Sequence, residues 1–311
     1  MQPPQIVVVG SHAPGLFIHV KRIPVAGETV IGWGFSEPVD GGKGSNQAIA
    51  AARLDARVSF VGSIGDDRIG REAETLLRQE KIDITYLRRS LTRPTGVGFI
   101  LLDDNGTPAM VTSMGANEEL DKEFVDEALS HMQGTKILLT QFEINPKVAL
   151  HAAQIAHQMG MISIVNPAPA SENSLTGLDY VDILIPNDLE AKQLLGLNPG
   201  TDADLCELAK SLLEKTGCGC VMITVGEKGV VVANRKSIRH IAPPAIKTVD
   251  TSGAGDVFCA GVAVGVLEGK DLIKAAEWAC YVAAHSVAVP GTIPSYPRRK
   301  EVQKFLQYIK L

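Results

Sequence analysis

The residues best suited to chemistry lie near the C-terminus, in the stretch Asp250–Asp256, which reads D-T-S-G-A-G-D. The apolar run Val257–Val266 follows and predicts a buried helix whose first amide groups face back into the glycine turn and attract an anion. A carboxylate on the same turn suits a base that takes the proton of a hydroxyl attacking a phosphate. We therefore interpret the stretch as a phosphoryl-transfer site in which Asp256 is the base. The amides that stabilise the transferring group are those of Gly253, Ala254 and Gly255. The alternative is a plain strand-to-helix turn that Asp256 caps.

A second glycine-rich turn, Gly41–Asn46, reads G-G-K-G-S-N and precedes an alanine-rich helical run. Its glycines let a polyol approach the backbone, while Lys43 and Asn46 supply donors that hydroxyls accept. Glu143 follows the predicted strand Ile137–Thr140 and can accept from another hydroxyl or from Lys43. Because a solvated loop needs fewer glycines, the pattern favours a binding site.

Two further loops remain open to a structural interpretation. Asn187-Asp188-Leu189-Glu190 follows the predicted strand Ile183–Ile185, where Glu190 can hold magnesium through water and Asn187 can meet phosphate. An ordinary helix start with a capping residue explains the same letters. Thr224–Gly229, which reads T-V-G-E-K-G, joins two predicted strands and either lies along a nucleotide or forms a simple hairpin turn.

Composition excludes several classes of protein. The formal net charge of −5 gives no support for nucleic-acid binding, and no apolar stretch is long enough to span a membrane. The five cysteines lack the spacing of a zinc site, so we expect reduced thiols in a cytoplasmic protein without a signal peptide. Neither a P-loop nor the dinucleotide-binding glycine pattern is present.

Alternating strands and helices from about residue 118 onward predict an α/β fold, a doubly wound and mostly parallel sheet flanked by helices. Two β-rich segments, at about residues 15–40 and 95–113, interrupt this pattern, and the second contains an Asn105-Gly106 hairpin turn. We expect the two segments to combine into one small β-sheet lid on a single domain of residues 1–311.

The motifs together resemble the ribokinase-like (PfkB) family of carbohydrate kinases, and its ribokinase branch most. G-G-K-G-S-N-Q-A at Gly41–Ala48 and D-T-S-G-A-G-D at Asp250–Asp256 are similar to the two family signatures. N-P-A-P-A at Asn166–Ala170, N-D-L-E and T-V-G-E-K-G lie between them in the family's order. The resemblance covers about residues 6–306.

This resemblance implies a kinase that moves the γ-phosphate of ATP to a primary hydroxyl of a sugar, a homodimer formed through the lid, and use of Mg²⁺ and K⁺. Asp256 is implied as the base and Gly253–Gly255 as the anion hole. The implied sugar-binding residues are Gly41, Gly42, Lys43, Asn46, Glu143 and Asp256. Those implied for ATP are Asn187, Thr224, Gly226, Gly229, Gly255 and Cys280, the last at a position where the ribokinase branch tends to have a polar residue. The implied metal ligands are Glu190 for Mg²⁺ and, for the monovalent cation, Asp250, Thr251, Ser286, Val289, Gly291 and Ser295.

One departure from the family pattern bears on the substrate. After the first strand the family usually has Asn-x-Asp, whose aspartate accepts from sugar hydroxyls, whereas this chain has Ala13-Pro14-Gly15. Each lost partner weakens binding by about 1–3 kcal/mol unless His12 or His19 substitutes. We therefore expect a sugar other than plain D-ribose, such as a ketose or a substituted sugar. The alternatives are a nucleoside kinase of the same fold and a sugar-binding regulator without catalysis.

Overall fold

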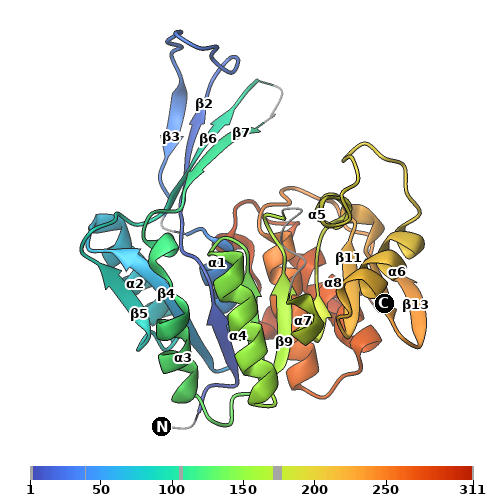
Figure 1. Ribbon diagram of the computed structural model, residues 1–311. Coiled ribbons are helices and arrows are strands. Elements are labelled where there is room, and N and C mark those ends of the chain that lie inside the picture. Colours follow the sequence, from blue (N-terminus) through green and yellow to red (C-terminus); the bar gives the residue numbers. More distant parts are fainter. Residues whose placement is uncertain (1–2, 39, 105–107, 171–176, 310–311) are drawn as a thin grey trace.

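Short β-branched runs form the centre of the protein. The computed structural model describes residues 3–38, 40–104, 108–170 and 177–309, and within them nine strands make one sheet in the order β13-β12-β11-β10-β9-β8-β1-β4-β5. Strand β1 (Ile6–Val9) is fully buried and pairs in parallel with both β4 and β8. Among these strands only β12 runs in the opposite direction, and it pairs antiparallel with β11 and with the edge strand β13. The predicted doubly wound, mostly parallel sheet is therefore confirmed (Figure 1).

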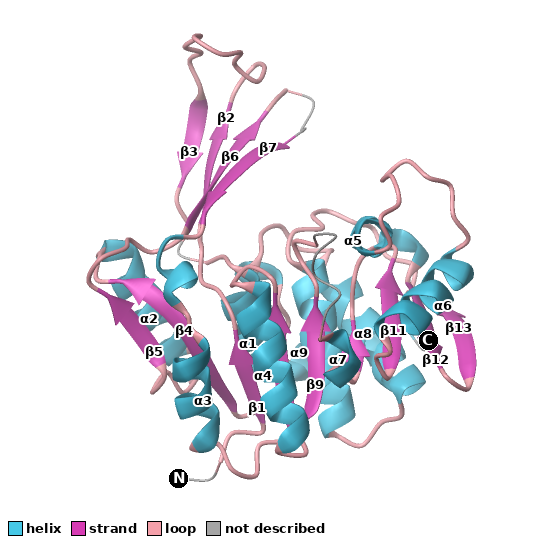
Figure 2. Ribbon diagram, in the orientation of Figure 1, coloured by secondary structure: helices cyan, strands magenta, loops and turns pink. Residues whose placement is uncertain are grey.

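Strands and helices of this body alternate for much of the chain, and the helices cover both faces of the sheet (Figure 2). Its remaining strands are β4 (Val58–Gly65), β5 (Leu87–Ser90), β8 (Ile137–Gln141), β9 (Ile162–Asn166), β10 (Ile183–Leu184), β11 (Cys220–Thr224), β12 (Val230–Asn234) and β13 (Ser237–Ile241). Its helices are α1 (Lys43–Arg53), α2 (Arg68–Gln79), α3 (Lys122–Ser130), α4 (Pro146–Gln158), α5 (Asp188–Leu194), α6 (Leu205–Thr216), α7 (Ala254–Leu267), α8 (Leu272–Ser286) and α9 (Arg299–Ile309). Short 3₁₀ turns are η1 (Gly115–Glu119), η2 (Leu178–Tyr180), η3 (Gly226–Lys228) and η4 (Ile293–Ser295). None of the helices described is long and apolar enough to cross a membrane.

Two apolar cores cover the two faces of the sheet. Alternate residues of β1 point to opposite sides, so Ile6 and Val8 join the core beneath α1, α7 and α8, while Val7 and Val9 join that of α3, α4 and α6. Helices α7 and α8 approach closely because α7 carries Gly261, where a Cβ would lie 2.9 Å from the backbone of the facing helix. This packing fixes α7, whose N-terminus opens the candidate site.

A small sheet stands away from the body, in the order β3-β2-β6-β7 (Figure 1). It combines β2 (Gly15–His19) and β3 (Trp33–Ser36) with β6 (Val97–Leu102) and β7 (Pro108–Ser113), and we call it the lid sheet. The two predicted β-rich segments therefore do combine into one small sheet, with β2 and β3 from the first and β6 and β7 from the second. The predicted Asn105-Gly106 turn lies outside the described residues. The assignment of the lid sheet and the body to a single domain remains a prediction.

Candidate active site

Asp256 is the buried carboxylate at the start of α7. It is 6% exposed, and each of its oxygens accepts one side-chain amide. Asn46 Nδ2 donates to Oδ2 at 3.0 Å, and Gln47 Nε2 donates to Oδ1 at 3.0 Å. The two amides are consecutive residues of α1, which packs against α7. The carboxylate is therefore oriented by a helix more than two hundred residues away in the chain.

Gln47 belongs to a longer chain of amide groups behind Asp256. Gln141 Nε2, at the end of β8, donates to Gln47 Oε1 at 2.6 Å, and Gln47 Nε2 also lies 3.3 Å from Asn166 Oδ1. Gln47 and Gln141 are fully buried, so these bonds are shielded from water. Because an ionised carboxylate only accepts, the amide group of Gln47 that faces Asp256 must be its NH₂.

The turn before Asp256 leaves the helix end open. Gly253 is the N-cap of α7, with φ of 73°, and no side chain caps the helix. The alternative in which Asp256 is the cap is therefore wrong, because Asp256 is the third residue of the helix. Gly255 is exposed, and a Cβ there would meet no atom within 4 Å. The Ala254 amide donates to the Thr251 carbonyl oxygen at 3.2 Å, but no side chain covers this helix end, and an uncapped helix N-terminus is an arrangement that binds anions.

The glycine-rich turn Gly41–Asn46 meets Glu143 beside this helix end. Glu143 Oε2 accepts from the Lys43 amide at 2.7 Å and from Ser11 Oγ at 2.6 Å. At Gly44 the backbone passes so close to β1 that a Cβ would lie 2.4 Å from the Ser11 amide nitrogen. The structure thereby brings the end of β1, the end of β8 and the start of α1 to one point, as parallel sheets do at the carboxyl ends of their strands.

Lys43 supplies the positive charge of this group. Burial lowers its pKa, but the negative charges of Asp256, Glu143 and Glu190 outweigh that effect, so the pKa of Lys43 is raised overall. Lys43 therefore stays protonated near neutral pH.

Asn187 and Glu190 form a capping box at the start of α5. Asn187 Oδ1 accepts from the Glu190 amide, and Glu190 Oε2 accepts from the Asn187 amide, each at 2.8 Å. The interpretation of this stretch as a capped helix start is therefore correct. Glu190 nevertheless remains part of the site, because its negative charge raises the pKa of Lys43. Burial raises the pKa of Glu190, against the effects of the Asn187 amide and of Lys43. Within the described residues, no three or more His, Cys, Asp or Glu side chains gather as a metal cluster.

The stretch Thr224–Gly229 lies beside Asn187. The Thr224 amide donates to the carbonyl oxygen of Pro186 at 3.0 Å, and the turn that follows contains η3. Gly229 has φ of 90°, and a Cβ there would lie 2.0 Å from the carbonyl oxygen of Ile241. The local backbone and its packing are therefore enough to require glycine at this position. Gly226 is exposed. Cys280 lies on the side of α8 that faces the core and is only 5% exposed. Burial raises the pKa of its thiol to about 12.

The residues implied for a monovalent cation lie on two loops that the structure joins. Asp250 Oδ2 accepts from the Gly291 amide at 2.8 Å, and Oδ1 accepts from the Ser252 amide at 2.9 Å. Burial raises the pKa of Asp250, but these bonds outweigh it, so the pKa is lowered. The Ser286 carbonyl already accepts from the Val289 amide, the Thr251 carbonyl accepts from Ala254, and Ser295 Oγ donates to Thr292. Each carbonyl oxygen retains a second lone pair for a cation.

The two histidines that could substitute for the family's aspartate have different surroundings. His12 is 1% exposed and its Nδ1 lies 3.0 Å from Ser45 Oγ, while His19 stacks on Trp33 in the lid sheet with ring centroids 6.0 Å apart. A Cβ on Gly15 would lie 2.9 Å from Ile100 Cδ1 and 3.0 Å from the ring of Phe17. Apolar side chains of the lid sheet thus occupy the surroundings of this position.

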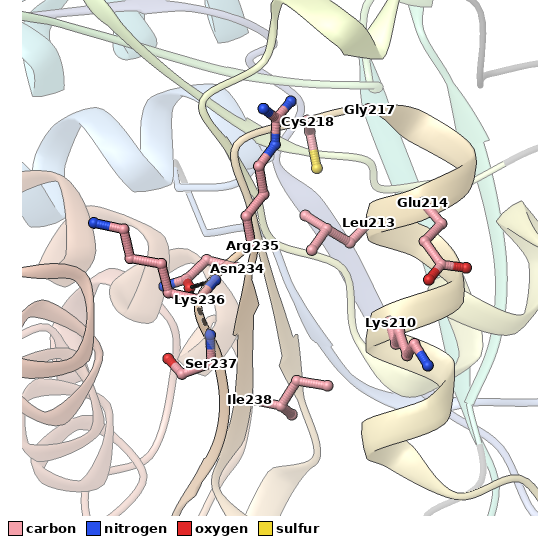
Figure 3. A pocket seen from close by; sticks show the side chains of 10 residues that line it. All are labelled: Lys210, Leu213, Glu214, Gly217, Cys218, Asn234, Arg235, Lys236, Ser237 and Ile238. Atoms are coloured by element: carbon pink, nitrogen blue, oxygen red, sulfur yellow. Dashed lines mark hydrogen bonds between the residues drawn. The ribbon is translucent and has the colours of Figure 1, made fainter.

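A separate pocket of about 580 Å³ lies at the far edge of the body (Figure 3). α6 and the turn between β12 and β13 form it, and its lining includes Lys210, Glu214, Arg235 and Lys236. All four are exposed surface side chains, and none of the predicted site residues lines it. The candidate active site is therefore the group of residues around Asp256.

Comparison with known proteins identifies the class. The sequence matches the pfkB family carbohydrate kinases over residues 5–299. The chain belongs to this family, so it is an ATP-dependent carbohydrate kinase with the ribokinase fold. The predicted resemblance is thereby confirmed.

Ribokinases and a deoxyribokinase are among the relatives. The chain is 35% identical to ribokinase of Haemophilus influenzae, covering 97% of this chain and 98% of the relative. It is 31% identical to deoxyribokinase of Salmonella typhi, covering 98% and 99%. Among solved structures, Arabidopsis thaliana ribokinase complexed with ribose and ATP superposes with a TM-score of 0.89 at 30% identity, covering 99% of each chain.

Sequence reasoning missed several residues of the site. Ser11, Gln47, Gln141 and Tyr296 were given no role, yet Ser11 bonds Glu143, the two glutamines position Asp256, and Tyr296 lies against Gly253. Gln47 stands inside a quoted motif, and its place one residue after Asn46 was the one available indication. The others are apparent only once distant segments are together.

Proposed function

We propose that this carbohydrate kinase transfers the γ-phosphoryl group of ATP to a primary hydroxyl of its sugar with Asp256 as the general base. The observation that supports it most is the carboxylate itself, buried at an uncapped helix N-terminus and oriented by Asn46 and Gln47. As the hydroxyl oxygen bonds to phosphorus, Asp256 takes its proton, and the bond from phosphorus to the ADP oxygen breaks. The amides of Gly253, Ala254 and Gly255 stabilise the charge on the transferring group.

Further residues hold the two substrates in this proposal. Gly41, Gly42, Lys43, Asn46 and Glu143 bind the sugar, while Asn187, Thr224, Gly226, Gly229 and Cys280 line the nucleotide. Glu190 would hold Mg²⁺ through water, and the ion would neutralise phosphate charge when bound. The residues that would hold K⁺ on the joined loops are Asp250, Thr251, Ser286, Val289, Gly291 and Ser295.

The experiment that tests the reaction is ADP release from Mg·ATP over a panel of pentoses, deoxypentoses, ketohexoses and nucleosides. Turnover of one sugar, at least about 100-fold slower in Asp256→Asn, would support both the reaction and the base. Turnover of nucleosides but not of free sugars would replace the proposal by a nucleoside kinase. Sugar binding measured by calorimetry without ADP release would replace it by a regulator.

The acceptor in this proposal is not plain D-ribose. Gly15 and Ala13 offer no side-chain partner to hydroxyls, and the surroundings of Gly15 are filled by Phe17 and Ile100. We expect a higher kcat/KM for a sugar that presents a deoxy carbon or an apolar substituent there, and the relative named deoxyribokinase makes 2-deoxy-D-ribose the first compound to test. Micromolar KM and rapid turnover with D-ribose would contradict this choice. A double variant, Gly15→Asp with Ile100→Ala to make room, is expected to shift preference toward ribose.

The lid sheet also supports a homodimer. Phe99 of β6 and Val111 of β7 are direct cross-strand partners and are 50% and 67% exposed, so they form an uncovered apolar patch. A second lid sheet that packs on this patch would remove it from water. Sedimentation of the wild type as a dimer and of Val111→Glu as a monomer would support this assembly, whereas a monomeric wild type would contradict it.

A further inference from the structure

Tyr296 reaches the turn that opens α7 from a separate and rigid segment. Its amide donates to the carbonyl oxygen of Ile293 at 3.1 Å. Arg53 Nη1 donates to the carbonyl oxygens of Ile293 at 2.6 Å and of Tyr296 at 3.0 Å. Arg53 is itself paired with Glu80 at 2.6 Å, and both side chains are largely buried. The Tyr296 backbone is therefore fixed to α1 on one side of the site.

The phenolic hydroxyl lies against Gly253. A Cβ built on Gly253 would lie 2.3 Å from Tyr296 Oη and 2.9 Å from its Cε1. Gly253 is also left-handed, with φ of 73°. Glycine at this position therefore serves two purposes, because it makes the turn and leaves room for the hydroxyl at the positive end of the helix.

This hydroxyl has no partner of its own. Tyr296 is 2% exposed, and Oη makes no hydrogen bond to any described residue. A buried donor without a partner costs folding free energy, so its retention calls for an acceptor that arrives from outside. A tyrosine hydroxyl can donate one hydrogen bond, and this one is free to do so.

We propose that Tyr296 Oη donates a hydrogen bond to the phosphoryl group while that group is held at the N-terminus of α7. The proposal rests on the proposed function and adds a side-chain donor to the backbone amides. An acceptor would reach Oη only in the loaded site, so the bond would stabilise the phosphoryl-bearing state without adding to the stability of the free protein.

The test is Tyr296→Phe, which removes only the hydroxyl, with Tyr308→Phe as the matched control on the exposed face of α9, where the side chain is 81% exposed. We expect kcat to fall about 10- to 100-fold in Tyr296→Phe, the loss of one hydrogen bond to a charged group, with the sugar KM unchanged. The unfolding temperature of the free protein should stay the same or rise, because an unpaired buried donor is removed. Tyr308→Phe should match the wild type in every measurement.

Two outcomes would overturn the role of Tyr296. One is a kcat within about threefold of the wild type, since one such bond corresponds to a larger change. The other is a fall in kcat together with a fall in unfolding temperature, which would mean that the hydroxyl supports the fold.

A second measurement separates this proposal from the proposed function. Calorimetry with Mg·ADP plus aluminium fluoride, a mimic of the transferring group, needs no sugar turnover. Tyr296→Phe should bind this complex at least about tenfold more weakly while binding Mg·ADP equally well. If the wild type turned over no sugar, the proposed function would fail, and this affinity ratio alone would decide the role of Tyr296. If the ratio of the affinity for the aluminium fluoride complex to the affinity for Mg·ADP were the same in both proteins, the role of Tyr296 would be refuted.

Discussion

Gln47 Nε2 lies 3.0 Å from Asp256 Oδ1, a bond that joins α1 to the first turn of α7. Gln141 sets the orientation of the Gln47 amide group, because it donates to Gln47 Oε1 at 2.6 Å and leaves the NH₂ group to face the carboxylate. Together with Asn46 on the other oxygen, Gln47 fixes the plane of the carboxylate toward the open helix end. The position of the base therefore depends on a residue that does not itself contact the substrates in our proposal.

Replacing Gln47 by Leu should lower kcat about 10- to 100-fold, the range for one hydrogen bond to a charged group, and leave the sugar KM within about threefold. Asp256 would lose one orienting bond, while the groups proposed to bind the sugar stay in place. Steady-state kinetics would measure this, with the unfolding free energy as a second readout that should fall by about 1–3 kcal/mol because Gln141 loses its acceptor. A large rise in KM with an unchanged kcat would show that Gln47 acts on sugar binding instead.

Gly253→Ala and Gly255→Ala form a matched pair at the anion hole. At Gly253 a methyl group meets Tyr296 Oη and a left-handed backbone, so we expect loss of more than about 1 kcal/mol of stability along with activity. At Gly255 a methyl group meets no protein atom and alanine favours a helix, so stability should hold or rise by up to about 1 kcal/mol. If the phosphoryl group occupies that open space, Gly255→Ala still loses most of its turnover. Full activity in Gly255→Ala would place the phosphoryl group elsewhere.

Glu190→Gln separates the capping role of Glu190 from a role at magnesium. The glutamine carbonyl can still accept from the Asn187 amide, so the helix start and the unfolding temperature should be preserved. The negative charge is lost, so the concentration of Mg²⁺ needed for half-maximal activity should rise about tenfold. Titration of Mg²⁺ at saturating ATP measures this. An unchanged magnesium requirement would leave Glu190 with its structural role alone.

His12 should make the protein less stable in mild acid. Burial lowers the pKa of His12 from 6.5 to about 4, although Asp67 opposes the shift, so between these values the unfolded chain binds the proton and the folded protein does not. Stability from this group is complete above about pH 6.5 and is lost as pH falls toward 4, by about 3 kcal/mol in all. Denaturant unfolding of wild type and His12→Asn from pH 4 to 7 should show a shallower loss in the variant. The control is His131→Asn, a substitution of an exposed histidine, which should match the wild type. Parallel curves of stability against pH for the wild type and His12→Asn would contradict the prediction.

The regular part of the fold is evident from local pattern. Buried β-branched runs such as Ile6–Val9 and the helices between them predict a parallel sheet, because a strand covered on both faces must be apolar throughout. Elements without that pattern were not identified. β5, Leu87–Ser90, carries two arginines at the sheet edge and buries only Ser90, and β3 is exposed along its whole length, so neither shows an apolar buried face.

The sequence alone determined the parts of the site that lie within one motif. Gly253–Asp256 combines a turn, a helix start and a carboxylate within four residues, and local geometry is enough to predict an anion beside a base. The family also followed from motif order along the chain. These conclusions needed no contact between distant residues.

Only the tertiary structure decided which side chains support that motif. Gln47 and Gln141 lie 94 positions apart, yet they adjoin because α1 packs across the end of β8. Tyr296 meets Gly253 because Arg53 holds the Tyr296 backbone, and Ile100 meets Gly15 because β2 pairs with β6. Side-chain packing between non-local segments sets these contacts, and periodicity along a chain contains no information about which non-local segments meet.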